Sequence, residues 1–264
     1  MKPGEAKAAL STMAGAARAV GRLMRQNLAV VSKKVNSASQ HDIKLDLDVR
    51  SQKLIERRLR RAYPRIALFG EEGVAGNPEA EHRWVVDPID GTVNFTYGIP
   101  HACISIALQE KRGTNYRTLA GVVYDPFLDE MWSAIRGQSA RLNGRIIRVT
   151  QRRKLREAIV AMGFAKNETT MKRGLPAFLA LLPRVRKIRL LGAAALSMTW
   201  VAAGRMDAYL EFGVRLWDIA AGGLIVECAG GEFWHRALEG DETYRICVNN
   251  GQLRPQIEKV IGKI

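Results

Sequence analysis

WVVDPIDGTVNF, residues 84–95, is the stretch of this 264-residue sequence that decides the fold. Its first three residues form an apolar run that predicts a buried strand. Asp87 and Asp90 follow the run and bring two carboxylates to the strand end. Gly91 allows close backbone approach. If Gly91 and Thr92 begin a helical turn, their N–H groups point at an anion. The stretch therefore predicts a cation site and an anion site side by side.

Two further acidic clusters also follow predicted strands. Glu71 and Glu72 come after IALF, and Asp218 opens a predicted helix after AYLEFG. Loops that leave strands are common positions for functional sites. Several carboxylates without His or Cys nearby favour Mg²⁺ over Zn²⁺. Taken singly, each cluster also fits a structural role, as a solvated turn, a β-turn or a helix cap.

The first half of the chain predicts two helices followed by a largely antiparallel sheet. The helices cover about residues 5–31 and 49–62, the second with Asp48 as its N-cap and apolar residues on one face. Short apolar runs then predict strands at Ile66–Phe69, Trp84–Val86, Cys103–Leu108, Leu119–Tyr124 and Glu130–Ile135. Asn143-Gly144, between apolar stretches, predicts a tight hairpin.

The second half alternates between predicted strands and helices. Strands are expected at Glu157–Met162, Val185–Leu191, Ala208–Phe212 and near Phe233 and Ile246, and helices at Met171–Leu182, Ala193–Ala203, Asp218–Ala229 and the C-terminal end. This alternation is typical of a layered α/β unit. We therefore expect an α+β subdomain over residues 1–150 and an α/β subdomain over residues 151–264, together forming one compact unit.

Composition narrows the class of protein. Hydrophobic residues make up 47% and charged residues 25%, as in a globular protein. No apolar run approaches the ~20 residues of a membrane span, and arginines interrupt the N-terminal segment where a signal peptide would be apolar. The three cysteines, Cys103, Cys228 and Cys247, are odd in number and lie in apolar contexts. Free thiols in a reducing cytoplasm are therefore expected.

The formal net charge of +15 is the most unusual feature of the composition. Basic residues cluster at 57–65, 145–156 and 184–189. Such a surface attracts phosphorylated metabolites, nucleic acid or acidic lipid, and it also fits an ordinary solvated face. No homeodomain, zinc-finger or RNA-recognition signature accompanies the charge.

Three motifs in order carry a resemblance to a known family. They are FGEEG (69–73), WVVDPIDGTVNF (84–95) and LWDIAAGGLIVECAGG (216–231), with lesser matches in GIPHACISIAL, GVVYDPFLDEMWSAIRG and MDAYLEFG. The D-P-I-D-G-T and W-D-x-A-x-G patterns resemble the two signatures of the inositol monophosphatase family, over nearly the whole chain. The resemblance implies a layered αβαβα sandwich, an α/β (α+β) fold.

The resemblance also implies an activity. Members hydrolyse a phosphomonoester with two or three Mg²⁺ ions and are usually inhibited by lithium; myo-inositol 1-phosphate is the expected substrate here. Relatives of the same fold act on fructose 1,6-bisphosphate, 3′-phosphoadenosine 5′-phosphate or histidinol phosphate, and these substrates remain open. Members are commonly homodimers.

Residue roles follow from the resemblance by position. Those implied as metal ligands are Glu71, Asp87, the carbonyl of Ile89, Asp90 and Asp218. Glu71 and Thr92 would position the attacking water, with Asp90 completing the catalytic set. Those implied to bind substrate are Gly91, Thr92, Gly192, Ala193, Ala194, Glu211 and Asp218. Glu72 and Asp48 would lie next to the metal ligands, away from the metal, and hold them in position.

The sequence departs from the family before the second helix. The family has a lysine and then Asp-x-Val-Thr-x-x-Asp, where this chain reads VNSASQHDIKLDLD (35–48). Asp42 and Asp48 align, but leucines occupy the threonine positions and a serine lies near that of the lysine; Lys33, Lys34 and Lys44 are candidate replacements. The third metal and the loop that organises it are therefore open.

A function of another class also stays open. Some bacterial members of the family bind the transcription machinery and assist ribosomal RNA synthesis independently of catalysis. The positive charge suits such a partner. The complete set of carboxylates favours catalysis, because a pure binding module does not require it.

Overall fold

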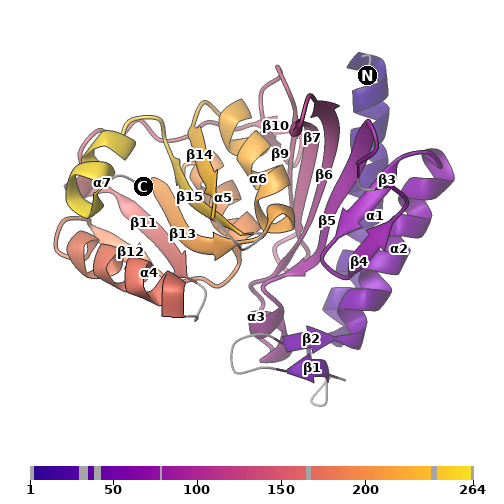
Figure 1. Cartoon of the computed structure of the whole chain (residues 1–264), viewed down its shortest axis with the longest axis horizontal. Coiled ribbons are helices and arrows are strands. Elements are labelled where there is room, and N and C mark those ends of the chain that lie inside the picture. Colours follow the sequence, from indigo (N-terminus) through magenta and orange to yellow (C-terminus); the bar gives the residue numbers. More distant parts are fainter. Residues whose placement is uncertain are drawn as a thin grey trace.

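The computed structural model describes residues 3–29, 35–38, 43–77, 79–164, 168–238 and 243–262. Five layers run through the molecule in the order αβαβα, which confirms the predicted fold class (Figure 1). One outer layer holds α1 (Pro3–Asn27) and α2 (Asp46–Ala62), and the central layer holds α5 (Ala194–Ala202) and α6 (Leu216–Cys228). The other outer layer holds α4 (Glu168–Leu181) and α7 (Arg254–Ile261).

The larger sheet lies between the first and central helix layers. In the described part of the chain its strands are ordered β10-β9-β8-β7-β6-β5-β3-β4, and every neighbouring pair is antiparallel except β3 with β5. The strands are β3 (Ala67–Gly70), β4 (Gly73–Ala75), β5 (His82–Asp90), β6 (Cys103–Arg112), β7 (Asn115–Asp125), β8 (Glu130–Ile135), β9 (Arg141–Leu142) and β10 (Arg145–Ile146). The predicted largely antiparallel sheet is confirmed.

The predicted hairpin is confirmed as well. Asn143 and Gly144 connect β9 to β10 with φ angles of 46° and 81°. Two consecutive left-handed residues are what a tight hairpin turn of the Asn-Gly type requires. A separate small hairpin pairs β1 (Val35–Ala38) with β2 (Ile43–Leu45).

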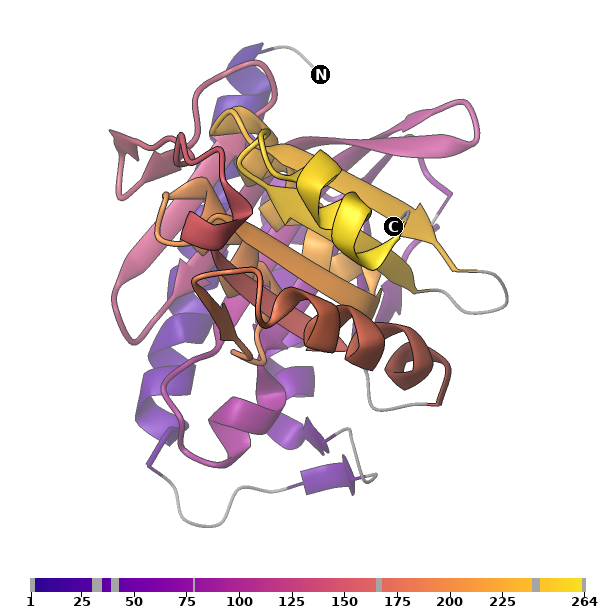
Figure 2. The same ribbon diagram turned by 90° about the vertical axis from the view of Figure 1, so that its left-hand side faces the viewer.

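The smaller sheet comes from the second half of the chain. Its order within the described residues is β12-β11-β13-β15-β14, with β11 parallel to β12 and β13 and the other pairs antiparallel. The strands are β11 (Ile159–Phe164), β12 (Lys187–Arg189), β13 (Ala208–Val214), β14 (Glu232–Ala237) and β15 (Tyr244–Asn249). Figure 2 shows α4 and α7 lying over the outer face of this sheet.

The two central helices explain the layering. The residues on every face of α5 and α6 are largely buried, as expected of helices covered on both sides. Gly222 and Gly223 of α6 allow the close approach: a Cβ at Gly222 would meet Met198 of α5 at 3.0 Å, and one at Gly223 would meet Phe233 of β14 at 2.3 Å. The larger sheet packs on the opposite side of α6.

Several predicted boundaries are wrong. α2 begins at Asp46, so Asp48 lies inside its first turn and is buried, whereas it was expected as the N-cap. The sequence offers two aspartates there, and the apolar face of the helix decides which one turns inward. The first helix ends at Asn27, and a 3₁₀ turn (Leu155–Glu157) occupies the predicted start of β11. Strand β4 is an additional element, and helix α3 (Thr92–Thr96) is a single short turn after Gly91.

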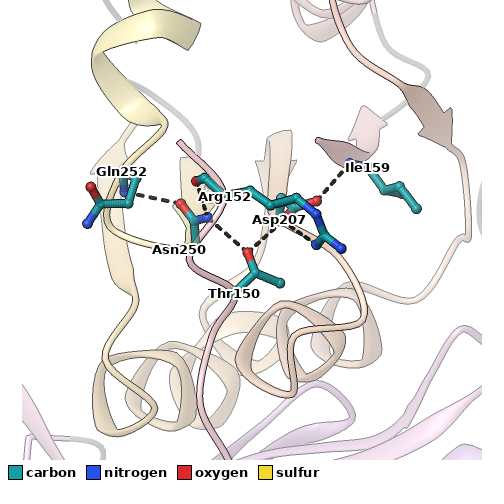
Figure 3. Close-up of polar contacts among 6 residues, drawn as sticks. All are labelled: Thr150, Arg152, Ile159, Asp207, Asn250 and Gln252. Atoms are coloured by element: carbon teal, nitrogen blue, oxygen red, sulfur yellow. Dashed lines mark hydrogen bonds and ion pairs between the residues drawn. The ribbon is translucent and has the colours of Figure 1, made fainter. Parts of the chain in front are cut away.

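A buried polar network fixes the start of the second half to the smaller sheet (Figure 3). Asp207, before β13, is fully buried and accepts hydrogen bonds from Thr150 Oγ1 (2.5 Å), Arg152 (3.0 Å) and the N–H of Ile159 (2.8 Å). Asn250, after β15, donates to Thr150 Oγ1 and to the carbonyl of Arg152, both at 2.9 Å. One carboxylate therefore joins the ends of three segments.

We expect Asp207→Ala to lower the free energy of unfolding by about 2–4 kcal/mol, because it leaves buried donors without their charged acceptor. Thr150→Val should cost less, about 1–2 kcal/mol, since it removes a neutral hydroxyl that donates to Asp207 and accepts from Asn250. Urea unfolding measures both. A loss in Asp207→Ala no larger than in Glu81→Ala, a change at an exposed loop position, would contradict a structural role for the network.

Candidate active site

A cavity of about 430 Å³ lies where the ends of β5 and β13 meet the starts of α3, α5 and α6. Every residue predicted as catalytic, metal-ligating or substrate-binding lines it, from both halves of the sequence: Glu71, Asp87, Ile89, Asp90, Gly91, Thr92, Gly192, Ala193, Ala194, Glu211 and Asp218. The structure therefore brings together side chains that are up to about 150 positions apart in the sequence.

Strand β5 delivers the first two carboxylates. Its buried residues lead directly to Asp87, and the register against β6 shifts between Asp87 and Asp90. The Ile89 N–H donates to Oδ1 of Asp87 at 2.9 Å, and the Ile89 side chain is buried. This irregular strand end allows Asp87 and Asp90 both to face the cavity.

Asp90 connects the two halves of the molecule. Its carboxylate accepts hydrogen bonds from the N–H groups of Ala194 (3.1 Å) and Ala195 (2.7 Å), at the N-terminus of α5. Cys103 Sγ donates to it at 3.5 Å. Burial raises the pKa of Asp90 to about 6, although these hydrogen bonds act in the opposite direction.

The neighbouring acids repel one another. Burial, followed by the charges of nearby carboxylates, raises the pKa of Asp87 well above its ordinary value. Burial and then Asp90 do the same to Asp218, against a 2.8 Å hydrogen bond from the N–H of Arg215. Glu71 shares a side-chain hydrogen bond with Asp87. A bound cation among these groups would replace mutual repulsion with attraction.

The donor set fits magnesium by its chemistry. The side chains predicted as ligands are all carboxylates, no His or Cys is among the described lining residues, and hard divalent cations prefer oxygen ligands. In the part of the chain that the structure describes, no three His, Cys, Asp or Glu side chains already meet as ligands of one ion. The carboxyl groups instead bond to one another and to backbone N–H groups, so ion binding requires them to turn toward the ion.

The anion side of the cavity is the start of α3. Gly91 precedes the helix with φ 90°, and Thr92 Oγ1 donates to the carbonyl of Ile89 at 2.8 Å. The predicted helical turn is confirmed. A Cβ at position 91 would meet the carbonyl oxygen of His101 at 2.9 Å, so only glycine fits this approach. The first N–H groups of a helix lack partners within it and can face an anion.

The cavity wall also includes Glu211 on β13 and the loop of Gly192, Ala193 and Ala194. This loop lies against the start of α3, since a Cβ at position 91 would be 3.2 Å from that of Ala193. Burial raises the pKa of Glu211 well above its ordinary value, with further contributions from Asp218 and Asp90. The carboxyl group of Glu211 packs against Gly163 of the adjacent strand β11, where a Cβ would lie 2.4 Å from its Oε2.

Two predicted residues lie away from the cavity. Glu72 donates its N–H to Oε1 of Gln52 at 2.9 Å, and Asp48 is buried on α2. Asp42, Lys33 and Lys34 lie outside the described residues, and so does the side chain of Lys44.

Sequence reasoning missed four residues that shape the site. Asn94 donates to the carbonyls of His101 (2.9 Å) and Leu191 (2.8 Å), which joins α3 to the loop before α5. Ser197 and Gly163 line the cavity, and Cys103 supports Asp90. Asn94 lies within the quoted motif and could have been singled out, whereas the contact of Gly163 with Glu211 depends on strand pairing.

Comparison with known proteins gives consistent results. The model of the "Inositol monophosphatase family" matches residues 6–261. The chain is 40% identical to "Nus factor SuhB" of Xylella fastidiosa, covering 85% of this chain and 81% of the relative. It is 37% identical to "Inositol-1-monophosphatase" of Mesorhizobium japonicum, covering 85% and 84%.

Solved structures agree. The extragenic suppressor protein suhB of Bartonella henselae superposes with a TM-score of 0.88 at 33% identity, covering 97% of this chain and 99% of that one. The IMPase of Thermotoga maritima gives 0.81 at 31% identity, with 94% of each chain covered. Because the family model spans residues 6–261 and relatives of 37–40% identity cover 85% of the chain, the protein belongs to the inositol monophosphatase family.

Proposed function

We propose that this protein is a Mg²⁺-dependent phosphatase of small phosphomonoesters, with myo-inositol 1-phosphate as its preferred substrate. One observation supports it above all: the carboxylates of Glu71, Asp87, Asp90 and Asp218 surround one cavity beside the N-terminus of α3. Hydrolysis of a phosphate monoester is among the slowest uncatalysed reactions known, and it needs cations and anion-binding N–H groups placed together.

Glu71, Asp87, the carbonyl of Ile89, Asp90 and Asp218 would hold two or three Mg²⁺ ions. When bound, Mg²⁺ neutralises the charge of the phosphate, acidifies the attacking water and stabilises the leaving oxygen. The chain itself orients the reactants: the N–H groups at Gly91 and Thr92 bind the phosphate, and Glu71 with the Thr92 hydroxyl positions the water.

The proposed substrate preference rests on Glu211 and on the Gly192–Ala194 loop, which line the same cavity as the phosphate site. Glu211 accepts hydrogen bonds from vicinal hydroxyls, and the Gly192–Ala194 loop offers backbone groups to the same ring. A relative at 37% identity carries the name inositol-1-monophosphatase. Fructose 1,6-bisphosphate, 3′-phosphoadenosine 5′-phosphate and histidinol phosphate are the comparison substrates.

A second candidate function is binding to RNA or to the transcription machinery. The relatives named Nus factor SuhB support it, and so does the positive surface. The three basic clusters are largely exposed, including Arg57, Arg61, Arg153, Arg156 and Arg186. Exposed arginines can contact phosphates without sequence readout.

Assembly and location complete the proposal. We expect a homodimer, and the exposed apolar side chains of Tyr97 and Ile99, next to α3, offer apolar surface for it. Cys103, Cys228 and Cys247 are all free thiols, which suits a reducing cytoplasm. In the described part of the chain no helix has the length and apolarity to cross a membrane.

We expect Asp90→Asn to lower kcat/KM for inositol 1-phosphate at least about a hundredfold, the loss typical of removing one group that stabilises transition-state charge. Asparagine keeps one oxygen acceptor but turns its NH2 group toward the second α5 N–H, so thermal stability should fall, and a thermal melt establishes that the variant is folded at the assay temperature. Phosphate release from the substrate panel, with Mg²⁺ and with chelator, measures this. Asp129→Asn is the matched control at an exposed position. Near-wild-type turnover in Asp90→Asn would refute the site.

Gly163→Ala should displace the Glu211 carboxylate without touching the phosphate site. We expect KM for inositol 1-phosphate to rise about tenfold, as the loss of a charged hydrogen bond implies. Hydrolysis of 4-nitrophenyl phosphate, which has no sugar hydroxyls, should be nearly unchanged. Gly15→Ala, where a Cβ meets no atom within 4 Å, is the control. Equal losses on both substrates would contradict the role given to Glu211.

The second candidate has its own test. A fluorescent single-stranded RNA should bind with an affinity that falls more than about tenfold between 50 and 200 mM salt. Asp90→Asn should leave this binding intact, and Arg57→Gln with Arg61→Gln should weaken it. Binding that is absent at low salt, or that disappears in Asp90→Asn, argues against a separate surface.

A further inference from the structure

A second cavity of about 650 Å³ lies on the other side of α6. Its floor is α6, and its walls come from the β6–β7 end of the larger sheet and from β14 of the smaller sheet. Figure 1 shows α6 lying between these two sheets. It shares no lining residue with the candidate active site. Its volume is within the ~300–1,000 Å³ typical of small-ligand sites.

Aromatic rings line both walls. Tyr116 contributes from the larger sheet, and its hydroxyl donates to the carbonyl of Ala80 at 2.9 Å, which fixes the ring. Phe233, His235 and Tyr244 form a row on the smaller sheet, with successive ring centroids 4.8 and 5.8 Å apart. Burial lowers the pKa of His235, so its ring is neutral near pH 7. Such walls suit a flat ring, which stacks on aromatic faces.

The charge of the cavity is positive. Among the described residues that line it, four are arginines and only Glu227 is acidic. Arg136 bonds to that glutamate at 2.8 Å, so these two charges offset each other and three arginines supply the positive charge. Arg83 lies over the Tyr116 ring at 3.6 Å, and its Nε donates to Gln109 Oε1 at 3.0 Å. The two more exposed arginines, Arg117 and Arg236, complete the set.

A ligand that uses both features carries a ring and an anionic group. An apolar ligand would remove water from guanidinium groups without replacing their hydrogen bonds. A sugar phosphate would satisfy the arginines and leave the rings unused. Gln109 and Thr118, linked at 3.3 Å, add amide and hydroxyl groups that can bond to the edge of a heterocycle.

We propose that this second cavity is a binding site for a free mononucleotide, with the base stacked between the aromatic walls and the phosphate held by the arginines. The site is independent of phosphatase chemistry, because it contains none of the carboxylates of the first cavity.

Calorimetric titration of the full chain with adenosine 5′-monophosphate, in chelator to prevent turnover, tests the proposal. We expect saturable binding with a Kd below about 1 mM. Adenosine and ribose 5-phosphate, which each lack one half of the ligand, should bind at least about tenfold more weakly. Tyr116→Leu and Arg83→Met should each weaken binding about tenfold, and thermal melts establish that both variants fold.

Two controls locate the site. Asp90→Asn should bind the nucleotide as wild type does, and so should Arg112→Met, a change of an exposed arginine at the end of β6 that does not line the cavity. Absence of saturable binding overturns the proposal. Binding that is lost in Asp90→Asn, binding unaffected by both cavity variants, or binding of a single-stranded oligonucleotide without the mononucleotide also overturns it.

Discussion

A buried carboxylate at the N-terminus of a helix holds the two halves of this molecule together. Asp90 ends a strand of the larger sheet and accepts the first N–H groups of α5, which comes from the second half. The helix dipole and two hydrogen bonds offset part of the cost of burying the acid. Because α5 must begin at that carboxylate, the position of the central layer between the sheets is fixed, and Asp218 and Glu211 arrive at the same cavity.

The site keeps unfavourable electrostatics that the rest of the fold must compensate. Asp87, Asp218 and Glu211 all have raised pKa values, because burial and neighbouring acids disfavour their charged forms. Functional sites commonly hold such destabilising groups. Here the compensation comes from the apolar surfaces of α5 and α6, which are buried on all sides, and from networks such as the one around Asp207.

Local patterns predicted most of the fold and the main site. Apolar runs located the strands of both sheets, and Asn143-Gly144 located the hairpin, because period and turn chemistry are local properties. The prediction of Asp48 as the helix N-cap was wrong. The helix begins at Asp46, and Asp48 is buried by tertiary packing that the local sequence does not show. The support of Glu211 by Gly163 and the second cavity depend on which strands lie side by side, which no local pattern encodes. The division near residue 150 stays a prediction.

The apolar character of α5 and α6 also affects how the chain is made. During synthesis the strands of the larger sheet leave the ribosome first, and α6 ends only at Cys228. At a synthesis rate of about 5–20 residues per second, several seconds separate the synthesis of this sheet from the synthesis of the helices that cover its inner face. An incomplete chain would present an uncovered apolar sheet for that time, and such surfaces favour association with other chains. The excess of basic residues in the sequence makes nascent copies repel one another, which works against such association.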